Sequence, residues 1–176
     1  DQAVPKDLAP LPIDEVGADV TERFKRTKRD PGAALAPLLE FTRGHPQRSM
    51  MLAHYLWDAT KRGEEADEAA WVAALDRAVA DTSRLMRAIW SALPANERRV
   101  ARALAVVSSP LYSEETANAV GIKRSSIGKA LAAMVDDADV IQHGGKPRLT
   151  DPMFELWLRR RGLTPASGED ELDEAE

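Results

Sequence analysis

Between residues 93 and 162 the sequence carries an ordered series of helix and turn signals that few folds can accommodate. An amphipathic helix is predicted over 96–107, after a Leu-Pro pair. Ser113 is followed by two glutamates, a typical start for a short helix, and Gly121 is a typical end. A tight turn then leads into a helix predicted over 125–137. Such a turn needs a residue that tolerates positive φ, as glycine does.

A β-hairpin is predicted directly after these helices. Segments 139–143 and 146–150 have the composition of short strands and flank a Gly-Gly pair. A last helix is predicted over 151–161. Helix, helix, tight turn, helix and hairpin is the order of a winged helix-turn-helix. We therefore expect residues 93–162 to form a winged helix domain with a small β-hairpin wing.

Residues 1–92 are predicted to form a separate helical domain, so the whole chain is expected to be mainly α. Alanine and leucine dominate and aromatic residues make up only 5% of the sequence, which favours helices over strands. The predicted helices cover about residues 14–29, 33–42, 46–62 and 64–93. Pro37 is expected to shift the start of the second of these helices, and Gly63 is expected to be the C-cap of the third. The fourth is predicted either as one helix or as two helices with a break at Thr82.

The net charge of −5 is unevenly distributed along the chain. Residues 91–165 hold 11 basic and 8 acidic residues, whereas residues 166–176 hold 6 acidic residues and no basic one. Residues 163–176 lack the apolar pattern needed to bury a core, so we predict that they form a disordered acidic tail. A mildly basic module followed by an acidic tail has different partners from a uniformly acidic protein.

Three absences narrow the class of protein. The sequence has no cysteine, and its three histidines are scattered, which argues against a metal site. No apolar run approaches the length of a membrane span, and no signal-peptide pattern opens the chain. We therefore expect a cytoplasmic protein with no metal site and no membrane partner.

The start of the second helix of the helix-turn-helix is the candidate DNA-binding site. In winged helices these residues enter the major groove of DNA. Cations neutralise phosphates, and hydroxyls or backbone amides donate hydrogen bonds to them. The candidates on this helix and on the wing are Lys123, Arg124, Ser125, Ser126, Lys129, Lys146 and Arg148.

Protein contact remains an alternative for the same module. Winged helices also dock proteins, and the basic excess of this region is small. Asp136, Asp137 and Asp139 lie close to the wing and repel phosphate. Double-stranded DNA and a protein partner are therefore both open as binding partners.

A second informative segment, Gly44 to Arg48, joins the end of one predicted helix to the start of the next. An arginine at such a place can point away from its helix and bind a phosphate in a facing domain through its forked guanidinium. The alternative is a corner between helices with a solvated arginine, which the local sequence alone favours.

The chain also resembles a known protein family in three segments, which occur in the order LLEFTRGHPQRSMMLAHYLW, LPANERRVARALA and RLTDPMFELWLRRR. They resemble the C-terminal half of AAA+ or STAND-type P-loop ATPases, above all archaeal-type ATPases related to origin-recognition ATPases. In those proteins a helical lid precedes a winged helix, and the chain often ends on a phrase like DPxFxxWLRR, here Asp151 to Arg160. The likeness covers residues 11–161.

This resemblance implies a role for the corner described above. Gly44 and Pro46 match the lid motif beside the nucleotide base, and Arg48 looks like the sensor-2 arginine that reads the γ-phosphate. The resemblance also implies a parent protein with an N-terminal P-loop ATPase domain that uses ATP and magnesium. No GxxxxGK[ST] segment occurs in this chain, so we expect no cofactor and no enzymatic activity from these residues alone.

Two functional hypotheses follow from the sequence. In the first, this chain is the C-terminal regulatory and DNA-binding portion of a P-loop ATPase, and its lid couples the nucleotide state to a winged helix on double-stranded DNA. In the second, the winged helix docks a protein partner or folds back onto the ATPase domain as an autoinhibitory module.

Overall fold

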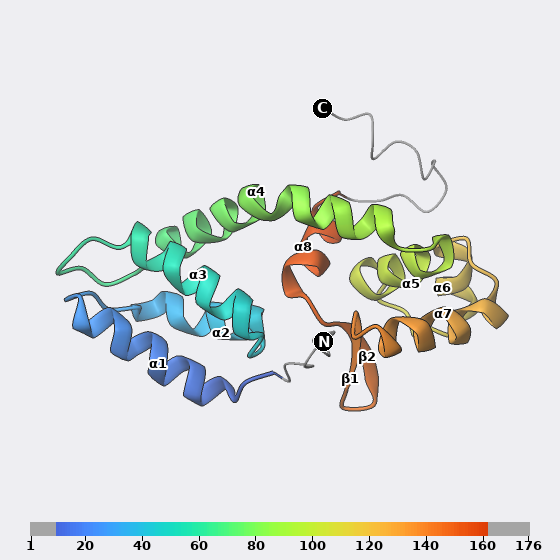
Figure 1. Ribbon diagram of the computed structural model, residues 1–176, viewed down its shortest axis with the longest axis horizontal. Helices are drawn as coiled ribbons and strands as arrows, with labels where there is room; N and C mark the ends of the chain where they lie inside the picture. The colour runs from blue at the N-terminus through green and yellow to red at the C-terminus, as the bar shows by residue number, and fades with distance from the viewer. Residues whose placement is uncertain (1–9, 162–176) are drawn as a thin grey trace, which may run out of the picture. The chain divides into compact units, whose positions relative to one another are not determined.

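The computed structural model describes residues 10–161, so the predicted acidic tail lies outside the described residues. Residues 10–161 contain eight α-helices, one short 3-10 helix and one two-stranded antiparallel sheet (Figure 1). The predicted mainly α fold with a small β-hairpin is therefore confirmed. None of the helices in this range is long and apolar enough to cross a membrane.

The chain divides into two compact units. The first comprises the residues up to Leu85 together with Asp151–Met153, and the second comprises Met86–Thr150 and the residues from Phe154 onward. The division falls inside a continuous helix, whereas the sequence placed a domain boundary after Ala92.

The first unit is entirely helical. It contains α1 (Ile13–Arg26), the 3-10 helix (Gly32–Ala34), α2 (Leu35–Thr42), α3 (Pro46–Ala59) and most of α4 (Glu68–Ala92). Helices α1, α2 and α3 pack against one another. The α1 side chains spaced four residues apart point into this core, as the amphipathic pattern predicted. The largest buried apolar side chains of the three helices are Val20, Phe24, Leu38, Leu52 and Leu56.

Two helices of the first unit end earlier than predicted. Helix α1 stops at Arg26 because Lys28 adopts a left-handed conformation with φ of 59°. Helix α3 stops at Ala59, where Thr60 becomes extended while its hydroxyl still donates to the Leu56 carbonyl. Gly63, expected as the C-cap of α3, lies instead in the turn that follows, with φ of 88°.

Nearby residues determine where α2 starts and keep α4 continuous. Pro37 shifts the start of α2, as predicted, and a 3-10 turn precedes Leu35. Helix α4 is uninterrupted, so the alternative with a break at Thr82 is wrong. The Thr82 hydroxyl donates to the Ala78 carbonyl at 2.6 Å, which satisfies this polar group within the helix.

The second unit has the element order predicted for a winged helix. It contains the end of α4, α5 (Ala95–Val106), α6 (Glu114–Ala119), α7 (Arg124–Asp136), β1 (Val140–His143), β2 (Lys146–Leu149) and most of α8 (Pro152–Arg161). Gly121, between α6 and α7, has φ of 65°, so the positive φ expected in this turn is confirmed. Helix α7 packs on α5, α6 and β1, and β2 also contacts α5. In the hairpin the buried Val140 pairs with the buried Leu149.

Helix α8 contributes the aromatic part of this core. Phe154 and Trp157 stack with ring centroids 6.1 Å apart, and Trp157 also packs against Trp90 of α4 at 6.3 Å. Leu158 is fully buried. These apolar residues belong to the DPxFxxWLRR phrase, so the phrase has a packing role in this chain.

Candidate functional site

The start of α7 is exposed and carries the predicted cations. Lys123 is its N-cap residue and Arg124 its first residue, and both are exposed. Ser125 and Lys129 are exposed one turn apart, whereas Ser126 is half-buried and its N–H donates to the Lys123 carbonyl at 2.7 Å. The structure therefore brings four of the candidate residues to one accessible helix end.

This helix end lacks a side-chain cap, unlike the starts of α3, α4, α6 and α8. The Ser113 hydroxyl accepts a hydrogen bond from the Thr116 N–H at the start of α6, and the His45 imidazole accepts one from the Arg48 N–H at the start of α3. Within residues 10–161 no side chain caps the start of α7. Apart from the Ser126 N–H, which donates to the Lys123 carbonyl, the first N–H groups of α7 and the positive end of its helix dipole therefore have no side-chain acceptor.

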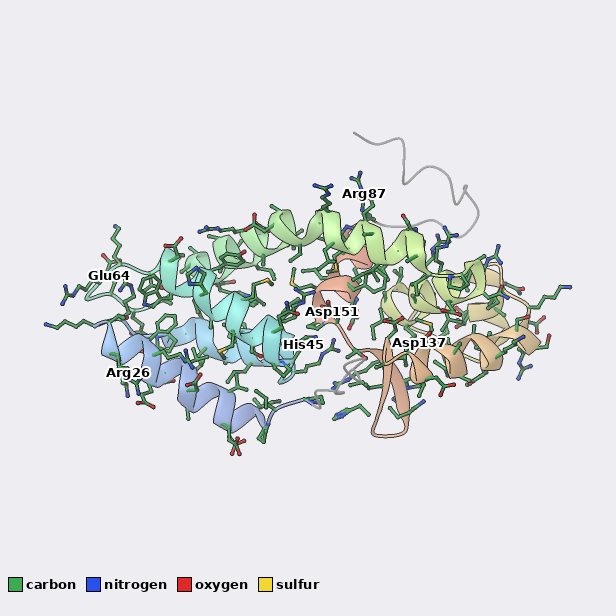
Figure 2. The ribbon with its side chains drawn as sticks, in the orientation of Figure 1. Arg26, His45, Glu64, Arg87, Asp137 and Asp151 are labelled. Atoms are coloured by element: carbon green, nitrogen blue, oxygen red, sulfur yellow. The ribbon has the colours of Figure 1, made fainter. Side chains whose placement is uncertain are left out.

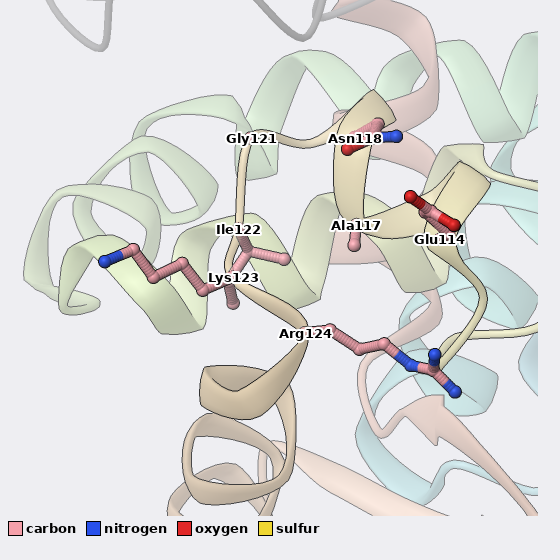
Figure 3. Close-up of a pocket in the computed structure, with 7 residues that line it drawn as sticks. All are labelled: Glu114, Ala117, Asn118, Gly121, Ile122, Lys123 and Arg124. Carbon is pink, nitrogen blue, oxygen red and sulfur yellow. The ribbon is translucent and has the colours of Figure 1, made fainter.

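A pocket lies between α6 and the start of α7. Figure 3 shows that Lys123 and Arg124 extend in different directions from the helix start, while Asn118 and Glu114 line the pocket from α6. Sequence reasoning did not single out Asn118, since nothing local distinguishes it from other exposed helix residues. The Glu114 carboxylate lowers the positive potential on this side.

The wing carries the two remaining candidates. Lys146 and Arg148 alternate along β2 with Pro147 and the buried Leu149, so the two cations lie on the opposite face from the core. Lys146 is exposed and Arg148 is half-buried. These two residues lie in the same unit as the α7 cations but on a separate element.

Acidic side chains gather close to this surface. Burial and the charges of Asp137 and Asp139 raise the pKa of Glu97 above its usual range. Burial and the charge of Asp137 likewise raise the pKa of Asp139. Carboxylates from α5 and from the end of α7 and its connection to β1 therefore repel one another.

The Gly44 corner depends on a close approach of two backbones. Gly44 is buried with φ of 79°, and its carbonyl accepts a hydrogen bond from the Leu11 N–H at 2.8 Å. A Cβ atom at this position would lie 2.1 Å from the Leu11 carbonyl oxygen. Only glycine fits here, and Pro46 then starts α3 at its first position, where the missing N–H costs nothing.

Arg48 is buried in an ion pair with Asp151, so it is not a solvated arginine. Its side chain is 5% exposed and that of Asp151 is 21% exposed. The Nη2 atom donates to Oδ2 at 2.5 Å, and Nε lies 3.0 and 3.1 Å from the two carboxylate oxygens. This forked pairing satisfies the guanidinium from within the first unit.

Asp151 also caps a helix, and the ion pair that it forms with Arg48 lies near His45 (Figure 2). The Asp151 Oδ1 atom accepts a hydrogen bond from the Met153 N–H at 2.8 Å and so caps α8. Burial lowers the pKa of His45, and the Arg48 charge lowers it further against the opposing effect of Asp151. The sequence singled out Asp151 only as the first residue of the DPxFxxWLRR phrase, and it identified neither the helix cap nor the pairing with Arg48.

The arginines that end α8 make specific contacts in the second unit. The Arg159 Nε atom donates to the Ala105 carbonyl at 2.7 Å, and its Nη2 atom pairs with Glu155 at 2.6 Å. The Arg161 guanidinium lies 4.4 Å from the centre of the Trp157 ring. These contacts add to the favourable interaction of cations with the C-terminal end of the helix dipole.

Comparisons with models of protein families, with curated proteins and with solved structures find no match for this chain.

Proposed function

We propose that this chain is the DNA-binding C-terminal portion of a P-loop ATPase and that α7 contacts double-stranded DNA. The observation that carries the proposal is the exposed group of Lys123, Arg124 and Lys129 at a helix start without a side-chain cap. Phosphate oxygens bind favourably at such a place, because backbone N–H groups, the helix dipole and the side-chain cations all favour negative charge.

The exposed residues of α7 favour contacts to the DNA backbone over base readout. Ser125, Gly128, Lys129 and Ala132 are exposed and follow one another at helical spacing. Glycine and alanine offer no side-chain donor or acceptor to base edges, and asparagine and glutamine, which read adenine, do not occur among these residues. Base readout by these exposed residues and Arg124 would therefore depend mainly on Arg124 and Lys129. We therefore propose that phosphate contacts supply most of the affinity.

The ATPase part of the proposal rests on the resemblance, and the ion pair between Arg48 and Asp151 sets a condition on it. These residues belong to two of the three segments that carry the resemblance. A nucleotide phosphate would have to replace the Asp151 carboxylate as the partner of Arg48. Release of Asp151 would also change the cap of α8, which gives a physical route from nucleotide state to the winged helix.

Docking of a protein is the second candidate, and the acidic side chains favour it. Glu97, Asp137 and Asp139 repel one another close to the winged-helix surface, and Glu114 lines the pocket beside Arg124. A basic protein surface would relieve this repulsion, whereas a DNA phosphate would increase it.

Fluorescence anisotropy with a labelled duplex separates the two candidates. If α7 binds DNA, affinity should fall steeply with salt, with a log–log slope of about −3 for three phosphate contacts. An absence of binding even at low salt would overturn the DNA proposal. The ATPase proposal is tested separately by the reading frame that encodes this chain, where a Walker A motif should precede Asp1.

A further inference from the structure

The positive charge of the second unit is concentrated away from the helix-turn-helix. Residues 113–150, which hold α6, α7 and the hairpin, contain five basic and five acidic residues. Residues 86–112 and 154–161 contain seven arginines and only two glutamates. The basic excess of this unit therefore lies on the end of α4, on α5 and on α8.

Three of these arginines lie against a pair of packed tryptophans, and with a fourth, Arg87, they form what we call the arginine cluster: Arg87, Arg98, Arg102 and Arg161. The guanidinium groups of Arg98 and Arg102 lie 6.0 and 5.5 Å from the centre of the Trp90 ring. Arg161 lies 4.4 Å from the Trp157 ring, which packs against Trp90. Burial and the charge of Arg87 lower the pKa of Arg161, so these two cations repel each other.

The cluster contains buried donors without acceptors. Among residues 10–161, no hydrogen-bond acceptor is found for the Nε atoms of Arg87 and Arg98 or for the indole Nε1 atoms of Trp90 and Trp157. Trp90 and Trp157 are 2% and 4% exposed, whereas Arg87 and Arg98 are only half-buried and reach solvent. The buried donor atoms themselves are out of reach of a ligand, but the solvent-facing guanidinium groups form a crowd of cations whose mutual repulsion a negatively charged ligand would relieve.

We propose that the arginine cluster binds an acidic peptide segment and that its occupant is residues 169–176 of this chain. This segment holds the six acidic residues Glu169, Asp170, Glu171, Asp173, Glu174 and Glu176. Carboxylates form forked, charge-assisted hydrogen bonds with guanidinium groups, which an uncharged ligand cannot match.

The connection along the chain favours this occupant over an external one. Only residues 162–168 separate Arg161 from the acidic segment, and each residue spans at most about 3.5 Å. A short tether gives an effective concentration of the order of millimolar, so even a weak interaction is populated without any added partner. The same acidic segment carries no apolar anchor except Leu172, so the interaction depends mainly on charge and weakens with salt.

A paramagnetic label on the acidic segment of the full chain tests this proposal. The sequence has no cysteine, so Ala175→Cys creates a single site for a nitroxide label. The binding proposed here brings the label close to Trp90 and Trp157, and their indole N–H signals in NMR spectra should broaden at low salt. Trp71 lies on the same continuous helix as Trp90, about 28 Å before it, and serves as the internal control that should keep its intensity. The broadening should disappear near about 1 M salt, where the screening length is short.

A matched pair of variants locates the binding surface. Arg87→Gln with Arg161→Gln removes two cations from the cluster and should restore the Trp90 and Trp157 signals. Lys123→Gln with Arg124→Gln removes the same charge from α7 and should leave the broadening unchanged. Equal broadening of the control tryptophan, no broadening at low salt, or loss of broadening in the α7 variant would each overturn the proposal. Loss of duplex binding in the cluster variant, with broadening retained, would instead identify a nucleic-acid surface.

Discussion

Arg48 and Asp151 lie 103 positions apart in the sequence, yet the guanidinium of one donates to both carboxylate oxygens of the other. Arg48 is buried and Asp151 is partly exposed, and the Asp151 carboxylate also accepts a hydrogen bond from the Met153 N–H. One carboxylate therefore satisfies a buried cation on α3 and caps α8. This gives the corner at Gly44 and the phrase that begins at Asp151 a shared structural role.

The first prediction concerns the stability that this pair provides. Asp151→Asn keeps a side-chain oxygen for the helix cap but leaves the Arg48 charge buried without a counter-charge. We expect the free energy of unfolding, measured by urea denaturation, to fall by about 3 kcal/mol. Asp58→Asn is the control, because Asp58 pairs with Arg77 at the surface, where both side chains are about half exposed. That change should cost less than about 1 kcal/mol. Equal costs for the two variants would contradict the role assigned to the buried pair.

The second prediction concerns the pH dependence of the α3 start. The imidazole of His45 accepts a hydrogen bond from the Arg48 N–H, which requires its neutral form, and burial holds its pKa below the usual 6.5. The contribution of neutral His45 to the free energy of unfolding is therefore complete above pH 6.5, and it is lost as the pH falls through the lowered pKa. His45→Asn keeps a capping oxygen and should remove this part of the pH dependence.

Thermal denaturation at a series of pH values between 8 and about 5 tests this expectation. His143→Asn on the exposed β1 strand is the matched control and should keep the wild-type pH dependence. If His45→Asn and His143→Asn both keep the wild-type pH dependence of thermal stability, His45 is not the titrating group.

The third prediction concerns the carboxylate repulsion beside the wing. Burial and the Asp137 charge raise the pKa of Asp139, so the fold is most stable when this carboxyl is protonated. Stability should decline as the pH rises through the raised pKa. Asp139→Asn should therefore stabilise the protein at neutral pH, by roughly 0.5 kcal/mol for a half-exposed site, and the gain should vanish in acid.

Urea denaturation at neutral and acidic pH measures this gain. Asp136→Asn removes an equal charge from an exposed position of α7 and is the control. A gain for Asp139→Asn that persists unchanged in acid would show that its cause is not the ionised carboxylate.

Local sequence signals predict those parts of the fold that local chemistry determines. The turn at Gly121 requires positive φ, Ser113 caps α6, and Pro37 shifts the start of α2, and each was predicted from a few neighbouring residues. The end of α3 was not predicted correctly. Gly63 was expected to end this helix, but the chain already becomes extended at Thr60.

Local sequence signals do not predict contacts between segments that are far apart in the sequence. The residues next to Arg48 and Asp151 in the sequence give no indication that these two side chains form an ion pair. The arginine cluster likewise depends on the packing of Trp90 against Trp157, which brings cations from three helices together. The sequence revealed the charges but not the surface on which they gather.

The most direct test of DNA binding through α7 compares two double variants in the duplex anisotropy titration. Lys123→Gln with Arg124→Gln removes two proposed phosphate contacts, so binding should weaken and the log–log salt slope should become shallower by about 2. Arg87→Gln with Arg161→Gln removes equal charge from the arginine cluster and should leave the slope unchanged. Equal slopes for the α7 variant and the unmodified chain would contradict the assignment of α7 as the DNA-binding element.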